Sequence, residues 1–107
     1  MNLVVLGLPG AGKGTQADNI SEKYGVPHVS MGDILRNNKG YRTESGETVG
    51  EIIDAGDPVE VETLKELLSQ RLDQPDAQDG FVLDGFPRTG EQAAAMDAIA
   101  EIDAILV

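Results

Sequence analysis

The sequence contains no cysteine, which excludes a disulfide framework, a thiolate zinc site and a cysteine nucleophile. It has no apolar run long enough to span a bilayer, and its N-terminus lacks the pattern of a signal peptide. We therefore expect a cytoplasmic protein with no membrane partner. At 107 residues the chain has the length of one domain with a modest core.

Positive charge is also scarce. Eight lysine and arginine residues stand against nineteen aspartate and glutamate residues, for a formal net charge of −11. Such a surface repels the phosphates of nucleic acids, so we expect no nucleic-acid partner. Acidic residues spread along the chain suit proteins that work in concentrated salt, where counterions screen their repulsion. The composition favours a halophilic source, with an ordinary acidic cytoplasmic enzyme as the alternative.

Glycine, in contrast, is concentrated in the stretch Gly7-Leu-Pro-Gly-Ala-Gly-Lys13-Gly-Thr15, between an apolar run at 3–6 and a helical pattern. Glycines let several backbone N–H groups approach the same phosphate oxygens, and the helix dipole adds partial positive charge. Lys13 supplies a full charge toward the terminal phosphates. The spacing matches a P-loop, although Gly14 follows the lysine and the hydroxyl falls at Thr15. The chain is therefore predicted to bind a nucleoside triphosphate.

Apolar periodicity predicts strands that alternate with helices. The predicted strands are 2–6, 27–29, 81–84 and 104–107. The predicted helices are 13–24, 30–38, 45–55, 61–72 and 89–99. This alternation is typical of an α/β fold with a parallel sheet and right-handed crossovers. Because helices follow one another between 30 and 60, we expect a small insert there, on a core formed by 1–29 and 61–107.

Polar residues mark several helix ends. Ser30, with Asp33 three residues later, predicts a capping box, and Thr89 with Gln92 predicts a second cap. Gly25 is the predicted C-terminal cap of the first helix.

Asp84 ends the third predicted strand, where the Walker-B carboxylate of a P-loop protein lies beside the phosphate loop. Its predicted role is to hold Mg²⁺ through water, because Mg²⁺ keeps much of its hydration shell. A strand-end aspartate by itself is more often a turn residue, but the upstream glycine loop reverses that preference.

Two arginines are candidates for a second phosphate. Arg88 follows the third strand at the carboxyl end of the sheet, where ligands of open α/β folds bind, and Arg36 lies on the helix opened by Ser30. The planar guanidinium donates two parallel hydrogen bonds to a phosphate. We expect both arginines on one phosphate that the glycine loop does not hold, with surface salt bridges as the alternative.

His28, the only histidine, lies in a short apolar strand and is predicted to be structural.

Together these motifs resemble the adenylate kinase family. The resemblance is carried by three segments: Gly7 to Gln16, Gly32-Asp-Ile-Leu-Arg36, and Asp84-Gly-Phe-Pro-Arg-Thr89 with Gln92. It implies a P-loop nucleoside triphosphate hydrolase-like, three-layer α/β fold with a small helical insert that binds a nucleoside monophosphate. The implied reaction converts ATP and AMP into two ADP, with Mg²⁺ as cofactor.

The resemblance also implies a role for individual residues. ATP phosphates would lie on Gly10, Ala11, Gly12, Lys13, Gly14 and Thr15. AMP would lie across 30–59, with its phosphate on Arg36 and Arg88. The rest of the implied AMP site consists of Asp57, Val59, Gly85 and Gln92.

Two departures from the family pattern bear on function. Met31 stands where the family usually has a threonine that hydrogen-bonds the AMP base, so a kinase for UMP or CMP remains an alternative, although Thr89 and Gln92 favour adenine. The family also continues past residue 107 with a lid, further arginines and a last strand and helix. The chain is therefore expected to be the N-terminal portion of a longer, monomeric enzyme, incomplete at its C-terminal end. By itself it would be weakly active, or an inactive nucleotide-binding fragment.

Overall fold

Four parallel strands form one sheet in the order β2-β3-β1-β4. The computed structural model describes residues 1–6 and 13–106. The strands are β1 (Asn2–Val5), β2 (His28–Ser30), β3 (Phe81–Asp84) and β4 (Ala104–Leu106). All four predicted strands are present, and the second lies one residue later than expected. Residue 107, the last of the predicted fourth strand, lies outside the described residues.

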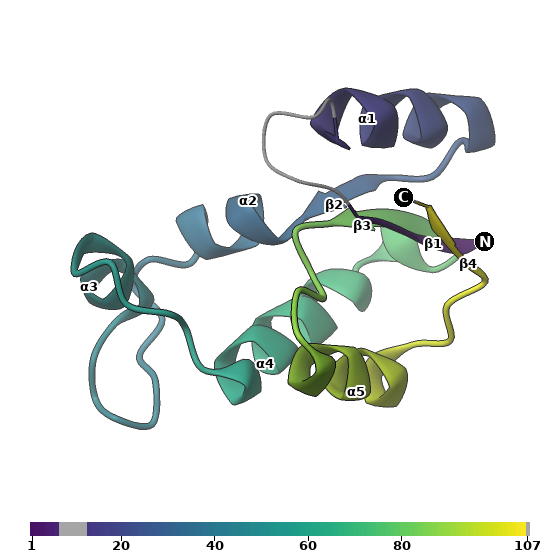
Figure 1. The fold of residues 1–107 in the computed structure, drawn as a ribbon. Coiled ribbons are helices and arrows are strands. Elements are labelled where there is room, and N and C mark those ends of the chain that lie inside the picture. Colours follow the sequence, from purple (N-terminus) through teal and green to yellow (C-terminus); the bar gives the residue numbers. More distant parts are fainter. Residues whose placement is uncertain (7–12, 107) are drawn as a thin grey trace.

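Helices cover both faces of this sheet, as Figure 1 shows. The helices are α1 (Lys13–Tyr24), α2 (Met31–Arg36), α3 (Val49–Asp54), α4 (Val61–Leu72) and α5 (Gly90–Ile99), with a short 3₁₀ helix η1 (Pro75–Ala77). One face carries α1, and the opposite face carries α4 and α5. The predicted three-layer α/β arrangement is confirmed.

The two central strands, β1 and β3, are mostly apolar because both faces of the sheet are buried there, whereas β4 at the edge is largely exposed. Val4 and Leu83 point into a cluster shared with α4 and α5, and neighbouring side chains point the other way. On that other face, Leu3, Val5 and Val82 pack with Ala17 of α1. Side chains of a strand alternate between the two faces, so each central strand contributes to both clusters.

The segment from 30 to 60 leaves the sheet and carries α2 and α3 away from it (Figure 1). The expected helix over 45–55 begins only at Val49, because Thr43 N–H bonds to the Glu47 carbonyl at 2.9 Å and closes a turn there. The expected helix over 30–38 likewise ends at Arg36. Ile34 and Val49 anchor the segment in the core cluster of the α4 side. The division into a core and a 30–60 insert remains a prediction.

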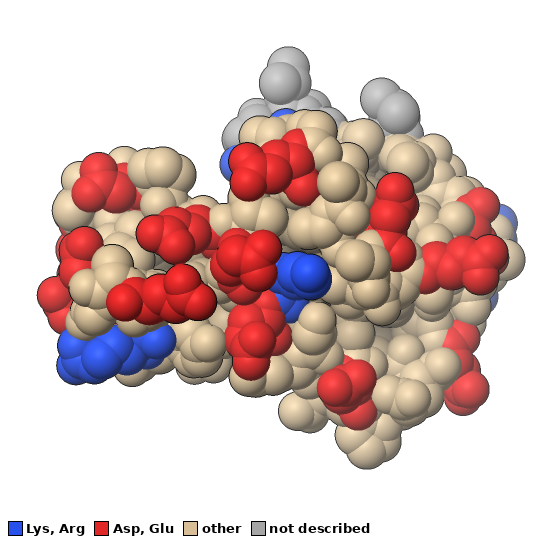
Figure 2. Space-filling model, turned by 90° about the horizontal axis from the view of Figure 1, so that it is seen from below, with Lys and Arg blue, Asp and Glu red and all other residues tan. Residues whose placement is uncertain are grey.

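Acidic side chains are spread over the face shown in Figure 2, with few basic ones between them. Some basic side chains of the described chain form ion pairs away from the carboxyl ends of the strands. Arg71 donates two hydrogen bonds to the Asp76 carboxylate, at 2.9 and 3.0 Å. Among the described residues, no helix combines the length and the apolar character needed to cross a membrane.

Candidate active site

The carboxyl ends of three strands lie in register at one edge of the sheet. Asp84 of β3 pairs with Val5 of β1 on one side and with Ser30 of β2 on the other. The chain leaves β1 toward the glycine-rich loop and leaves β2 directly into α2, so both candidate binding segments start beside Asp84. This is the edge at which open parallel sheets bind ligands.

The predicted ATP-phosphate residues fall only partly within the described chain. Gly10, Ala11 and Gly12 lie outside the described residues. Lys13, Gly14 and Thr15 form the start of α1, whose first turn carries no acidic residue. The partial positive charge at the start of this helix is therefore not neutralised by a carboxylate of its own first turn, which suits an anion.

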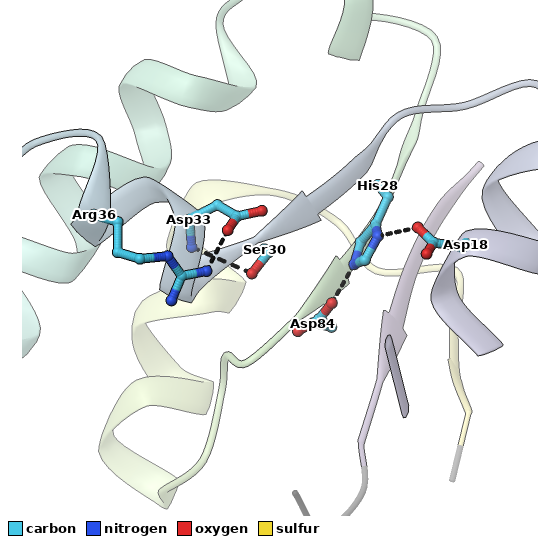
Figure 3. Close-up of polar contacts among 6 residues, drawn as sticks. All are labelled: Asp18, His28, Ser30, Asp33, Arg36 and Asp84. Carbon is cyan, nitrogen blue, oxygen red and sulfur yellow. Dashed lines mark hydrogen bonds and ion pairs between the residues drawn. The ribbon is translucent and has the colours of Figure 1, made fainter. Parts of the chain in front are cut away.

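Asp84 is largely buried, with a side chain 9% exposed, and it contacts His28 (Figure 3). The Nε2 atom of His28 faces the Asp84 carboxylate, and its Nδ1 atom lies 2.6 Å from Asp18 Oδ1 of α1. Burial lowers the pKa of His28, but hydrogen bonds and negative charge from Asp84 and Asp18 outweigh it and raise the pKa above 6.5. A protonated imidazole donates from both ring nitrogens, as two flanking carboxylates require.

This histidine connects β2, β3 and α1, and its structural role remains a prediction. Its contact with Asp84 was not anticipated from the sequence. Asp18 was missed as well, because an aspartate on the polar part of a helix carries no signal of its partner.

Beyond Asp84 the chain turns at Gly85, whose φ of +85° favours glycine. A Cβ atom at Gly85 would lie 3.4 Å from the Cβ of Met31, so β3 and α2 approach closely here. The Nε atom of Arg88 donates to the Gly85 carbonyl at 3.1 Å. Gly85, Met31 and Arg88 are thus brought together. Met31 itself is 4% exposed and belongs to the core cluster.

Gln92 fixes the segment that carries Arg88. Its backbone N–H donates to Thr89 Oγ1 at 3.1 Å, which confirms the predicted helix cap. Its side-chain Oε1 accepts from the Arg88 backbone N–H at 2.7 Å. The sequence predicted the cap but not this second bond, through which Gln92 helps to orient the backbone of Arg88.

Arg36 lies on α2 and points toward Asp33 of the same helix (Figure 3). Both side chains are mostly exposed, at 63% and 64%. Ser30 caps the helix by accepting from the Asp33 backbone N–H at 3.3 Å, but the Asp33 carboxylate pairs with Arg36 and does not complete the expected capping box. In the described part of the chain, Arg36 and Arg88 share no hydrogen-bond partner, so their joint action on one phosphate remains a prediction.

The two remaining candidates for the AMP site, Asp57 and Val59, lie after α3. The Asp57 backbone N–H donates to the Ile52 carbonyl at 3.1 Å, where Gly56 with φ +76° ends the helix. Val59 is partly buried against the core cluster. Neither residue contacts Arg36, Arg88 or Gln92 through a hydrogen bond among the described residues.

The layers, the strand order and the strand-end edge define a P-loop-type α/β protein. A family model described as adenylate kinase matches residues 5–107. The chain is 51% identical to "Adenylate kinase" of Mycobacteroides abscessus and 50% identical to that of Mycolicibacterium smegmatis; each match covers 99% of this chain and 61% of the relative. It is 49% identical to "Adenylate kinase" of Archaeoglobus fulgidus, over 99% of this chain and 51% of that protein. This chain belongs to the adenylate kinase family.

The chain spans between half and two thirds of the length of these relatives. The matches cover nearly all of this chain, including the sheet edge, α1 and the 30–60 segment. All three motifs that carry the family resemblance lie inside the matched residues 5–107.

Proposed function

We propose that this protein catalyses reversible phosphoryl transfer from MgATP to AMP, giving two ADP. The observation that carries this proposal is the register that aligns Val5, Asp84 and Ser30 at one sheet edge. Because of it, the predicted donor loop and the predicted acceptor segment start side by side. Two nucleotides held there would have their phosphates near the same carboxylate.

The proposed roles follow from the charge of each group. Lys13 and the amides of residues 10–15 hold the donor phosphates, and Arg36 and Arg88 hold the acceptor phosphate. Gly85, Gln92 and the backbone near Asp57 and Val59 bound the rest of the AMP site. Phosphoryl transfer needs little covalent chemistry from the protein, so positioning and positive charge account for the catalysis.

Asp84 is the residue proposed to hold Mg²⁺ through water. Its buried carboxylate at the strand end fits this ion, which is commonly bound by one or two carboxylates together with substrate phosphates. The described residues contain no cluster of three metal-ligating side chains, so we propose that the metal arrives with ATP. When bound, Mg²⁺ neutralises charge on the phosphates.

Two alternatives are kept. One is a kinase for UMP or CMP, since Met31 replaces a base-binding threonine of the family. The other is a nucleotide-binding module without catalysis. We further propose a cytoplasmic, monomeric enzyme whose partners are ATP and AMP, without nucleic acid or membrane.

Turnover assays of the 107-residue chain, beside a form extended to the length of its relatives, separate enzyme from module. In the active form, Lys13→Ala is expected to reduce turnover by on the order of 10³-fold, the loss attached to one preorganised charge donor. Lys23→Ala is the matched control, since Lys23 lies at the other end of α1, over the Tyr24 ring at 5.5 Å. A loss below about tenfold for Lys13→Ala would remove Lys13 from the mechanism. Binding of ATP and AMP without transfer would favour the module.

Met31→Thr tests the choice of base. Threonine restores a hydroxyl near the proposed AMP site, so binding of AMP relative to UMP or CMP should improve by about 1 kcal/mol, one ordinary hydrogen bond. Competition binding measures this difference. Thermal unfolding must accompany it, because Met31 is buried in the core and its loss also removes packing. A parent protein that already prefers pyrimidines would place the first alternative ahead.

A further inference from the structure

The two candidate phosphate arginines are held by different kinds of acceptor. Arg88 bonds to a neutral backbone carbonyl, that of Gly85. Arg36 bonds to a carboxylate, that of Asp33, one turn earlier on α2. A phosphate that approaches Arg36 therefore has to displace a negative charge, whereas a phosphate that approaches Arg88 does not.

The Arg36 guanidinium is folded back over its own helix. A Cβ atom at Gly32 would lie 3.2 Å from Nη1, 3.4 Å from Nη2 and 3.6 Å from Cζ of Arg36. The guanidinium thus occupies the space that a side chain at position 32 would fill. Gly32 leaves room for this position, and Asp33 holds Arg36 in it through the ion pair.

The capped start of α3 shows that a carboxylate at this point of a helix can be used differently. There, Glu51 accepts from the Thr48 backbone N–H at 3.4 Å, and Thr48 accepts from the Glu51 N–H at 3.2 Å, which completes a capping box. At the start of α2, Ser30 supplies its half of the same arrangement, but the Asp33 carboxylate bonds to Arg36. The charge of Asp33 is thus directed at a phosphate-binding candidate.

We propose that Asp33 is a positioning residue that holds Arg36 over Gly32 in the nucleotide-free protein and releases it when the acceptor phosphate binds. The inference rests on the proposed function of Arg36. An exposed pair of this kind is weak, and a phosphate carries more charge and accepts two parallel bonds from a guanidinium. The exchange therefore costs little, but it lowers the affinity for the monophosphate.

The nucleotide-free contact is tested first, by the NMR signal of the Arg36 guanidinium, whose Nη2 atom contacts Asp33 Oδ1. Asp33→Asn should shift this signal, and Asp54→Asn should not. Asp54 is the matched control, because it lies on α3 in the same segment and forms no ion pair among the described residues. An Arg36 signal unaffected by Asp33→Asn would overturn the inference, whatever the protein binds.

AMP affinity is then measured in the parent, Asp33→Asn, Arg36→Ala and the double variant, at low salt. Asp33→Asn should tighten AMP by about two- to fivefold, the range set by exposed ion pairs, and should lower the KM for AMP without changing that for ATP. In the Arg36→Ala background the same substitution should have no effect. A merely structural role predicts the opposite sign, because loss of a first-turn carboxylate weakens the helix.

Asp33→Asn could tighten AMP equally with and without Arg36, or by no more than Asp54→Asn does. Either result would show that removal of Asp33 acts only through the overall charge, and would overturn the inference. If the parent binds no AMP, or if Arg36→Ala leaves AMP affinity unchanged, the proposed acceptor site is wrong. The NMR result is independent of AMP, so failure of the ion-pair contact and failure of the proposed function are distinguishable.

Discussion

The sheet and the 30–60 segment are held together by different interactions. In the sheet, Val5, Val82 and Leu83 are fully buried, and apolar clusters cover both faces. The 30–60 segment buries Ile34 and Val49 in the core, but it also relies on caps and turns, such as the Thr48–Glu51 capping box and the bond from Gly50 N–H to the Lys39 carbonyl at 2.9 Å. Burial fixes the strand ends firmly, whereas exposed hydrogen bonds exchange readily with water and hold the segment less tightly.

The largest effect is expected in the sheet. Leu83 is completely buried, so Leu83→Ala leaves a cavity in the core. The substitution should lower the free energy of unfolding by about 3 kcal/mol or more. Ile53→Ala is the control in α3, since Ile53 is 36% exposed and loses less burial than Leu83. Denaturant unfolding measures both variants. Similar losses for the two would show that the segment is packed as firmly as the sheet.

A smaller effect is expected at the capping box of α3. Thr48→Ala removes the cap and should cost about 1 kcal/mol of stability. Hydrogen exchange should show the loss mainly in the amides of residues 48–55, with β1 and β3 unchanged. Protection lost equally across the sheet would mean that the segment and the sheet unfold as one cooperative unit.

The sequence also predicted the sheet more accurately than the 30–60 segment. Apolar runs and helical spacing predicted every strand, α1 and α4, because burial leaves a periodic pattern in the sequence. In the segment, α3 was predicted four residues too long at its start, because the competing turn at Thr43 to Glu47 is stabilised by a backbone bond that no periodicity shows.

Contacts between distant residues were the main omission within the site. The motifs located Asp84, Arg36, Arg88 and Gln92, but not Asp18, the partner of His28. A similar case is Gly80, which the sequence placed in a polar connection; a Cβ atom there would lie 2.3 Å from the Met1 carbonyl oxygen. Such pairings depend on how the chain folds back on itself, and one sequence carries no record of them. The halophilic source likewise remains a prediction.

The smallest effect concerns His28, which links the sheet to α1. Its pKa is raised in the folded protein, so its pairing with Asp84 and Asp18 adds to stability below about pH 6.5. That contribution is lost as the pH rises through the higher pKa of the folded state. Unfolding free energy should therefore decline over this range, and His28→Gln should flatten the decline. A parent curve that rises with pH there would contradict the raised pKa.

The central claim is that the acceptor nucleotide binds between the fixed strand ends and the 30–60 segment. Backbone amide NMR of the protein during titration with AMP tests it most directly. The account predicts shifts concentrated in residues 30–59 and 84–92, reduced in Arg36→Ala and Arg88→Ala. Saturable AMP binding whose shifts lie elsewhere, for example on the outer side of α1 around Asn19 and Lys23, would contradict it.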